Sequence, residues 1–203
     1  MTALTEPAGL TTLPYELHPV RSDRLLLRSL TEADVDDVFA YQSIPDVVRH
    51  LPWPLRTFDE SRQHTLKRAG FTRLEKDGDG VVLAAELVGT DGAAGPVIGD
   101  FSIVMKSHEN AQVDVGWVLH PDYQGKGYAT EGASALLDIA FGEIGAHRVC
   151  AELGPANTAS AALCRRLGMR HEAHFVENEI FKGGWGDLDV YAILDREWTI
   201  RPS

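Results

Sequence analysis

A glycine-rich stretch is the part of the sequence best suited to chemistry. Residues 124–129 read Gln-Gly-Lys-Gly-Tyr-Ala and lie between an alternating apolar segment and a helical one. Closely spaced glycines let successive backbone N–H groups turn towards one point, and the N-terminus of a following helix adds positive potential there. The stretch therefore predicts a loop that binds an anion such as a pyrophosphate.

Two common nucleotide-binding patterns fit this stretch poorly. A triphosphate-binding loop has Gly, four residues and then Gly-Lys-Ser/Thr, whereas here His120 stands at the first position and Gly127 at the last. A dinucleotide-binding fingerprint needs a third small residue where Thr130 lies, although Glu152 is near the expected acidic position. A loop that merely connects two elements is a further alternative.

The elements before the glycine-rich stretch alternate with a period of two. This pattern predicts strands over 81–87, 99–105 and 113–119, and the short turns between them make an antiparallel meander. In the third strand, Trp117 and Leu119 share one face and Asp114 lies on the other. Upstream we expect a loose arm over 1–20, a strand over 25–30, two helices opened by capping boxes at Thr31 and Thr57, and an irregular segment over 43–56.

The elements after the stretch begin with a helical period. Ala133, Leu136, Leu137, Ala140 and Phe141 fall on one face of a helix. A strand over 148–153, a short helix over 157–167 and strands over 169–181 and 187–194 complete the pattern. The predicted fold class is thus mixed α/β, with a mostly antiparallel central sheet flanked by helices.

Several motifs together resemble those of the GCN5-related N-acetyltransferases, the GNAT family. Gln124, Gly127 and Ala129 match its Gln/Arg-x-x-Gly-x-Gly/Ala loop, which binds acyl-CoA. Residues 114–117, 157–160 and 167–169 are similar to the acidic-aliphatic-Gly-aromatic, Asn-x-x-Ser and Leu-Gly-Phe stretches of the subgroup that acetylates ribosomal-protein N-termini, the RimJ/RimL type. With 24–28 and 194–198, the resemblance covers roughly residues 22–198.

The resemblance implies a GNAT fold with a splayed strand pair and acetyl-CoA as the cofactor. The pantetheine arm would bind the backbone of Trp117, Val118 and Leu119. Asn157 would bind this arm or orient Ser160, which also contacts CoA, although Asn157 equally suits a helix cap. The backbone amides that would hold the pyrophosphate belong to Gln124, Gly125, Lys126, Gly127, Tyr128 and Ala129.

The resemblance also implies catalytic roles. Direct transfer needs a neutral amine, so a general base should help, and Asp114 matches a position where the family more often has Glu. A solvated strand carboxylate is the alternative for Asp114. The Leu119 amide would stabilise the oxyanion, and Ser160 would protonate the CoA thiolate, because Cys164 stands where many relatives have Tyr. Cys164 also suits a small buried core residue, and nothing implies a metal.

The composition limits the classes of protein to which this chain can belong. A chain of 203 residues with 44% hydrophobic residues fits one domain, which we place at 22–198 after an N-terminal arm (1–21) and before a C-terminal tail (199–203). Nineteen Lys and Arg against thirty Asp and Glu give a net charge of −11, which argues against nucleic acid and anionic membranes as partners. Cys150 and Cys164 are too few for a disulfide framework, and no segment resembles a signal or membrane span, so we expect a cytoplasmic protein.

These observations predict an acetyl-CoA-dependent N-acetyltransferase that acts on a primary amine. A protein or peptide N-terminal amine fits the subgroup, while a small cationic amine such as an aminoglycoside or polyamine fits the acidic charge. A catalytically silent acyl-CoA-binding module is the alternative from a different class. Trp53 and Trp185 are candidates for walls of the acceptor site, and a homodimer is possible because relatives often dimerise.

Overall fold

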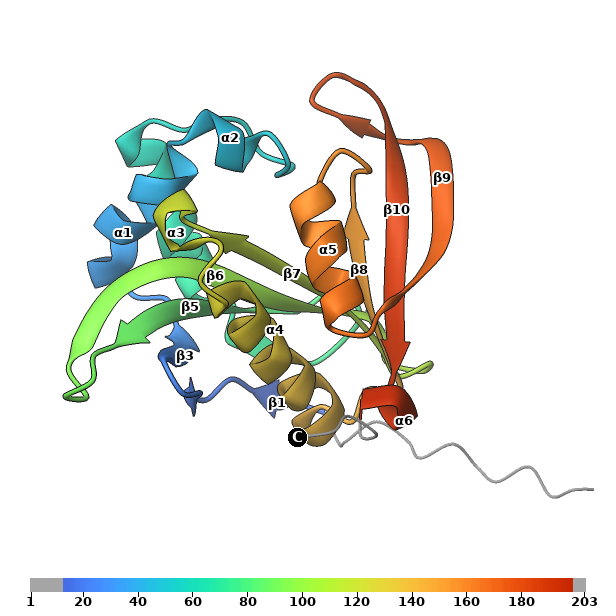
Figure 1. The fold of residues 1–203 in the computed structure, drawn as a ribbon, viewed down its shortest axis with the longest axis horizontal. Coiled ribbons are helices and arrows are strands. Elements are labelled where there is room, and N and C mark those ends of the chain that lie inside the picture. The colour runs from blue at the N-terminus through green and yellow to red at the C-terminus, as the bar shows by residue number, and fades with distance from the viewer. Residues whose placement is uncertain (1–12, 199–203) are drawn as a thin grey trace, which may run out of the picture.

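The computed structural model describes residues 13–198 and places helices on both faces of one large sheet (Figure 1). The strands are β1 (Tyr15–Glu16), β2 (Val20–Arg21), β3 (Leu25–Ser29), β4 (Arg73–Leu74), β5 (Gly80–Val88), β6 (Ala94–Ser107), β7 (Gln112–Leu119), β8 (Arg148–Leu153), β9 (Arg170–Phe181) and β10 (Gly184–Leu194). Eight of them form the large sheet in the order β2-β3-β5-β6-β7-β8-β10-β9, and β1 pairs separately with β4.

The helices largely begin where the sequence predicts. They are α1 (Val35–Gln42), α2 (Pro45–Val48), α3 (Phe58–Ala69), α4 (Tyr128–Asp138), α5 (Thr158–Arg166) and α6 (Asp195–Trp198), with 3₁₀ turns at Glu32–Asp34 and Pro121–Tyr123 and a π-helical turn at Ile139–Glu143. Both capping boxes are confirmed: the Thr31 N–H donates to Asp34 Oδ2 at 2.7 Å, and the Thr57 N–H donates to Glu60 Oε2 at 2.8 Å. None of the helices within 13–198 is both long and apolar enough to cross a membrane.

The large sheet is antiparallel except at one junction, where β7 and β8 run parallel. Their register covers only Gln112 to Asp114 against Arg148 to Cys150, after which the two strands diverge. The predicted mixed, mostly antiparallel fold with a splayed strand pair is therefore confirmed. A dinucleotide-binding fold needs a mostly parallel sheet, whereas here only β7 and β8 run parallel, so that alternative is wrong.

Strand β7 contributes to a different core on each face of the sheet. Val113, Val115 and Leu119 lie in the larger core, which Leu136 and Leu137 of α4 also enter. Val118 lies in a smaller core on the other face, with side chains of α1. Helix α4 lies so close to the sheet that a Cβ at Gly132 would overlap the Phe101 ring. The two faces of β7 thus look towards different sets of helices.

The start of the described chain differs from the prediction. We expected order to begin near Arg24, but Tyr15–Glu16 pairs with Arg73–Leu74 and Val20–Arg21 pairs with Leu26–Leu27, so that prediction is wrong. Strands of two residues are too short to show a period between prolines, which is why the pattern missed them. Residues 1–12 of the expected arm and the expected tail at 199–203 lie outside the described residues, and the division into arm, domain and tail stays a prediction.

Candidate active site

The gap between β7 and β8 is the central feature of the site. Because the pairing ends at Asp114 and Cys150, the stretch from Trp117 to Leu119 lies beside the gap without a ladder partner from β8. The Gln124 side chain donates from Nε2 to the Leu119 carbonyl oxygen at 3.1 Å. This bond ties the glycine-rich loop to the end of the strand that borders the gap.

The glycine-rich loop has a backbone that only its glycines adopt easily. Gly125 and Gly127 have φ of +72° and +87°, and Gly127 is the N-cap of α4, which starts at Tyr128. A Cβ at Gly127 would lie 3.2 Å from Arg24 Nη2. Since the first N–H groups of a helix have no partner within it, the loop and the start of α4 together present donors to an anion.

Arg24 fixes this loop from the side. Its Nη1 donates to the Lys126 carbonyl oxygen at 3.0 Å, and its guanidinium lies 4.4 Å from the centre of the Tyr128 ring. Glu131 of α4 orients Arg24 through an ion pair at 2.7 Å and accepts a hydrogen bond from the Arg24 N–H at 2.7 Å. The sequence showed Arg24 only as part of an opening motif, because its contact with residues more than a hundred positions away leaves no local pattern.

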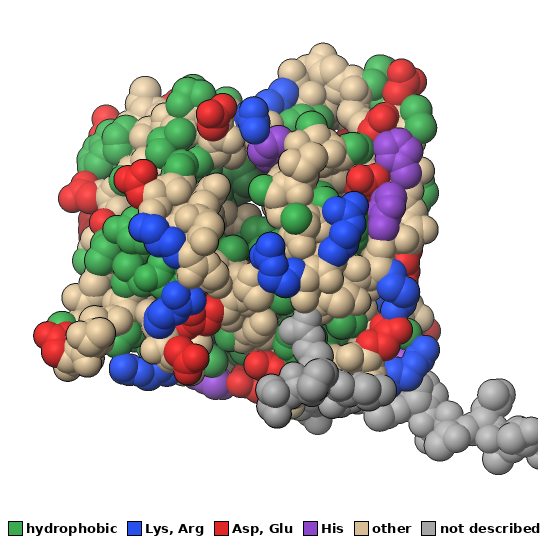
Figure 2. Space-filling model, viewed as in Figure 1, with side chains coloured by type: hydrophobic (Ala, Val, Ile, Leu, Met, Phe, Trp, Pro, Cys, Tyr) green, Lys and Arg blue, Asp and Glu red, His purple; other side chains and the backbone are tan. Residues whose placement is uncertain are grey.

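A cleft of about 750 Å³ lies at the loop, lined by Asp23, Arg24, Gly125, Gly127, Ala129, Thr130, Glu131, Ser134 and Arg166. At its edge, Arg166 Nη1 donates to Thr130 Oγ1 at 3.1 Å, which joins α5 to the first turn of α4. Figure 2 shows Lys and Arg side chains around a hollow on this face of the molecule. The cleft thus carries two arginines, Arg24 and Arg166, together with the carboxylates of Asp23 and Glu131.

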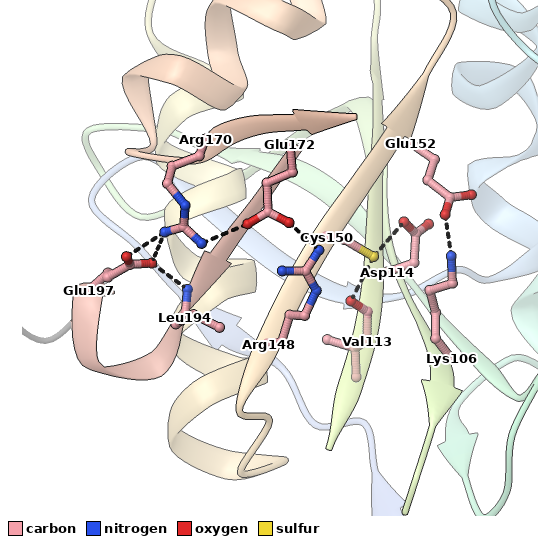
Figure 3. Close-up of polar contacts among 10 residues, drawn as sticks. All are labelled: Lys106, Val113, Asp114, Arg148, Cys150, Glu152, Arg170, Glu172, Leu194 and Glu197. Atoms are coloured by element: carbon pink, nitrogen blue, oxygen red, sulfur yellow. Dashed lines mark hydrogen bonds and ion pairs between the residues drawn. The ribbon is translucent and has the colours of Figure 1, made fainter. Parts of the chain in front are cut away.

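Asp114 lies at the point where the gap begins, on the face of β7 opposite Trp117. The Cys150 thiol donates to the Asp114 carboxylate at 3.5 Å (Figure 3), and the Glu152 backbone N–H acts on the same carboxylate. Burial first, and then the negative charge of Glu152, raise the pKa of Asp114 to about 7, while Lys106 opposes this rise. A carboxylate with this pKa can accept a proton at neutral pH.

The neighbours of Asp114 were not identified from the sequence. Lys106 forms an ion pair with Glu152, and burial, followed by Asp114, raises the pKa of the Cys150 thiol to about 12. Cys150 is therefore a thiol that donates rather than a thiolate. One ligand atom each of Asp114, Cys150 and Glu152 lies within 4.8 Å of the others, a spacing that a metal ion can use, but the Lys106 ammonium already balances Glu152. That no metal is required stays a prediction.

Helix α5 brings Ser160 to the other face of β7. The Trp117 indole N–H donates to Ser160 Oγ at 3.2 Å, and Asn157 Oδ1 accepts the Ser160 N–H at 3.1 Å. Asn157 is thus the N-cap of α5, which confirms the cap reading. Cys164 is fully buried, as expected for a core residue. The structure therefore brings Trp117, Asn157 and Ser160 together and separates them from Asp114 by the sheet.

The β9–β10 hairpin borders the face of the sheet that carries Asp114. Lys182 at its turn donates from Nζ to the Val48 carbonyl oxygen at 2.7 Å, so the hairpin lies beside α2 (Figure 1). Its two histidines have partners within the sheet, since His171 and His174 both contact Asp189, at 3.1 and 2.7 Å. Trp185 of the hairpin is 66% exposed.

Comparison with known proteins gives consistent results. Residues 24–170 match the family model described as an acetyltransferase (GNAT) domain. The uncharacterized N-acetyltransferase YnaD of Bacillus subtilis is 33% identical over 181 residues, covering 89% of this chain and 99% of YnaD. A GNAT-family acetyltransferase structure from Bacillus anthracis has a TM-score of 0.76 and 30% identity, covering 89% of this chain and all of that one.

A more distant structure shares the fold. The ribosomal L7/L12 α-N-protein acetyltransferase RimL, solved in complex with coenzyme A, has a TM-score of 0.70 at 19% identity and covers 87% of this chain and 98% of that one. At this identity the likeness concerns the fold alone. The fold, the glycine-rich loop and the matched relatives all indicate the same family.

Proposed function

This chain belongs to the GNAT family of N-acetyltransferases, and on that premise we propose that it transfers the acetyl group of acetyl-CoA directly to the N-terminal amine of a protein or peptide. The observation that carries the proposal is the gap between β7 and β8, which opens directly beside the glycine-rich loop. The motifs at 114–117 and 157–160 support an N-terminal amine as the acceptor.

In this proposal the residues of the loop hold the CoA pyrophosphate. The Gln124 N–H already donates to the Pro121 carbonyl oxygen, so the N–H groups from Gly125 to Ala129, at the start of α4, would hold it, and the backbone of Trp117 to Leu119 would pair with the pantetheine arm as another strand would. Bound acetyl-CoA supplies the activated thioester. Arg24 and Arg166 line the cleft at the loop, and their guanidinium groups would donate to the phosphate oxygens.

The remaining residues move protons. Asp114 takes up the proton that the amine loses as its nitrogen attacks the thioester carbon, through a chain of waters, because Asp114 lies five residues, about 16 Å along the strand, from Leu119. The Leu119 N–H stabilises the oxyanion that forms on that carbon. When the carbon–sulfur bond breaks, Ser160 gives its hydroxyl proton to the departing thiolate and regains one from water. The Trp117 indole supports this role, because Ser160 Oγ already accepts its hydrogen bond and the hydroxyl hydrogen is left to point elsewhere.

A small cationic amine is the second candidate acceptor, and the net charge of −11 favours it. The test is release of free CoA thiol from acetyl-CoA in the presence of N-terminal peptides, polyamines or aminoglycosides, with CoA binding measured in parallel. We expect acceptor-dependent release with peptides. Release with polyamines alone would show that the acceptor is a small cationic amine rather than an N-terminal amine. Absence of CoA binding would overturn the assignment of residues 124–129.

A further inference from the structure

The inner face of α3 is polar, although a helix packed on a sheet normally presents apolar side chains there. Ser61, His64, Thr65 and Arg68 recur at helical spacing and share one face. Ser61 and Thr65 are fully buried, and Arg68 is 7% exposed. Buried polar groups need hydrogen-bond partners, so this face should have them close by.

Arg68 has its partner in the sheet. Both of its terminal nitrogens donate to Asp100 of β6, and the Tyr41 hydroxyl donates to the same carboxylate at 2.6 Å. The charge of Asp100 is therefore balanced by Arg68 within the fold.

A second group of polar side chains lies beside Arg68 and contains buried polar atoms without hydrogen-bond partners. We call Trp53, Arg56 and His64 the Trp53 cluster: the indole and imidazole rings are 5.1 Å apart, and the Arg56 guanidinium is 5.1 Å from the indole centre. Within residues 13–198, no hydrogen-bond partner is found for Trp53 Nε1, Arg56 Nη1 or His64 Nδ1. The same holds for the hydroxyls of Ser61 and Thr65 on the adjoining face of α3. Each such buried group costs about 1–3 kcal/mol until it is paired.

The chemistry of the Trp53 cluster is that of an anion receptor. Burial and then the charge of Arg68 lower the pKa of Arg56. The Glu60 carboxylate also acts on Arg56, but it is engaged in capping α3 at Thr57. Burial, Arg56 and Arg68 lower the pKa of His64 to about 4, which leaves that ring neutral at pH 7. The cluster thus offers the Arg56 guanidinium, whose neighbour Glu60 also caps α3, with the Trp53 indole N–H beside it.

The position of the cluster places it on the acceptor side of the sheet. Arg68, 5.9 Å from the Trp53 ring, binds Asp100, and Asp100 is paired with Val118 of β7. Val118 and Asp114 share a face of β7, and Val118 directly precedes Leu119, the amide assigned to the oxyanion. Trp53, Arg56 and His64 are half-buried, so part of each side chain is open to a ligand, and the residues from 51 to 56 form no helix or strand.

We infer that the Trp53 cluster binds a carboxylate of the acceptor, next to the amine that is acetylated. This inference rests on the proposed function and narrows its substrate class to amines that carry a nearby carboxylate, as in an amino acid or a peptide with an acidic side chain near its N-terminus. A carboxylate accepts hydrogen bonds from guanidinium and indole N–H groups and balances the Arg56 charge. A polyamine would instead bring a second positive charge to Arg56.

The test compares acceptors that differ only in the carboxylate. N-terminal peptides with Glu or Gln at positions one to three, and single amino acids as free acids or amides, are measured for kcat/KM and, by titration calorimetry, for binding to the CoA-loaded protein. We expect the acid of the preferred pair to exceed its amide by at least tenfold in both measurements. Arg56→Gln should reduce that ratio to near one, and Arg56→Lys should retain part of it.

The control variant is Arg62→Gln, because Arg62 is an exposed arginine of the same helix and pairs with Glu32. It should keep the parent ratio, and all variants should keep the parent KM for acetyl-CoA. An equal preference for acid and amide, or a ratio that Arg56→Gln leaves unchanged, would overturn the inference. Acid-selective binding without turnover would instead contradict the proposed transfer and leave the carboxylate site supported.

Discussion

At the scale of single residues, Asp114 depends on its neighbours for its proton affinity. Burial and Glu152 raise its pKa to about 7, and Lys106 works in the opposite direction. If Asp114 is the base, kcat/KM of the parent rises with pH through about 7, in addition to the rise from a peptide amine near 7.7–8.0. In Asp114→Asn, kcat/KM should lack the rise near pH 7 and should be at least 10²-fold lower than in the parent. Superimposable pH–rate profiles of parent and variant would remove Asp114 from the mechanism.

Glu152→Gln is the matched control for this profile. It removes a negative charge that raises the pKa of Asp114 but leaves the carboxylate in place. The rise assigned to Asp114 should therefore move to lower pH, while the maximal rate changes little. A profile that does not move would show that the titrating group is another residue.

Asp114 also links pH to stability, and the sign follows from its raised pKa. The folded protein binds the Asp114 proton more tightly than the unfolded chain, so this contribution to stability is present below about pH 4 and is lost as pH rises through about 7. Asp114→Asn should thus raise Tm by a few degrees at pH 8 and leave it nearly unchanged at pH 4. Thermal unfolding followed by circular dichroism at both pH values measures this, and a lower Tm at pH 8 would contradict it.

Gly127 is the residue of the loop that tolerates a side chain least. Its φ of +87° is costly for a β-branched residue, and a Cβ there meets the guanidinium of Arg24. Gly127→Val should weaken acetyl-CoA binding by at least 100-fold in titration calorimetry while the fold remains intact. Gly142→Ala is the control, because a Cβ there meets nothing within 4 Å. Unchanged affinity in Gly127→Val would refute the proposed role of the loop.

The candidate residues were predictable only where a motif carries them. Asp114, Gln124 and Ser160 lie in local patterns that the sequence displays. Cys150 and Lys106 reach Asp114 through strand register, which depends on pairings across the sheet and leaves no local signature. The polar face of α3 is visible as a spacing, but its lack of partners emerges only once α3 lies on the sheet.

At the scale of elements, α5 depends on its cap. Asn157→Ala should cost about 1 kcal/mol of unfolding free energy, because the Ser160 N–H loses its acceptor. Asn157→Asp keeps an acceptor oxygen and should keep the stability, as urea denaturation can measure. These two variants also distinguish a helix cap from a CoA contact as the role of Asn157. A loss of CoA affinity in Asn157→Asp would show that its amide also contacts CoA.

Elements with a clear period were predicted well, and those without one were missed. Strand β8 has the predicted bounds because its apolar run is flanked by polar residues. The two-residue strands β1 and β2 and the four-residue helix α2 are too short for any periodicity, and they exist because tertiary partners hold them. Helix α3 ends at Ala69, with Gly70 as its C-cap.

At the scale of the whole molecule, the β9–β10 hairpin presents apolar side chains at an edge of the sheet. Strand β9 lies at one edge of the large sheet. The exposed fractions are 47–70% for Phe175, Val176, Ile180 and Trp185. We expect the edge of β9 to pair with a second copy, so light scattering should report a dimer and Ile180→Glu should shift it to a monomer. Leu66→Glu, at an exposed apolar residue of α3, should leave the dimer intact. A monomeric parent would contradict this expectation.

The two faces of β7 have a consequence for the order of events in turnover. The glycine-rich loop and Ser160 lie with α4 and α5, whereas Asp114 and the Trp53 cluster lie on the opposite face of the sheet. The proposed function therefore gives each substrate its own face of the sheet, and neither has to leave before the other binds. We expect a ternary complex, intersecting double-reciprocal plots, and CoA that competes with acetyl-CoA but not with the amine.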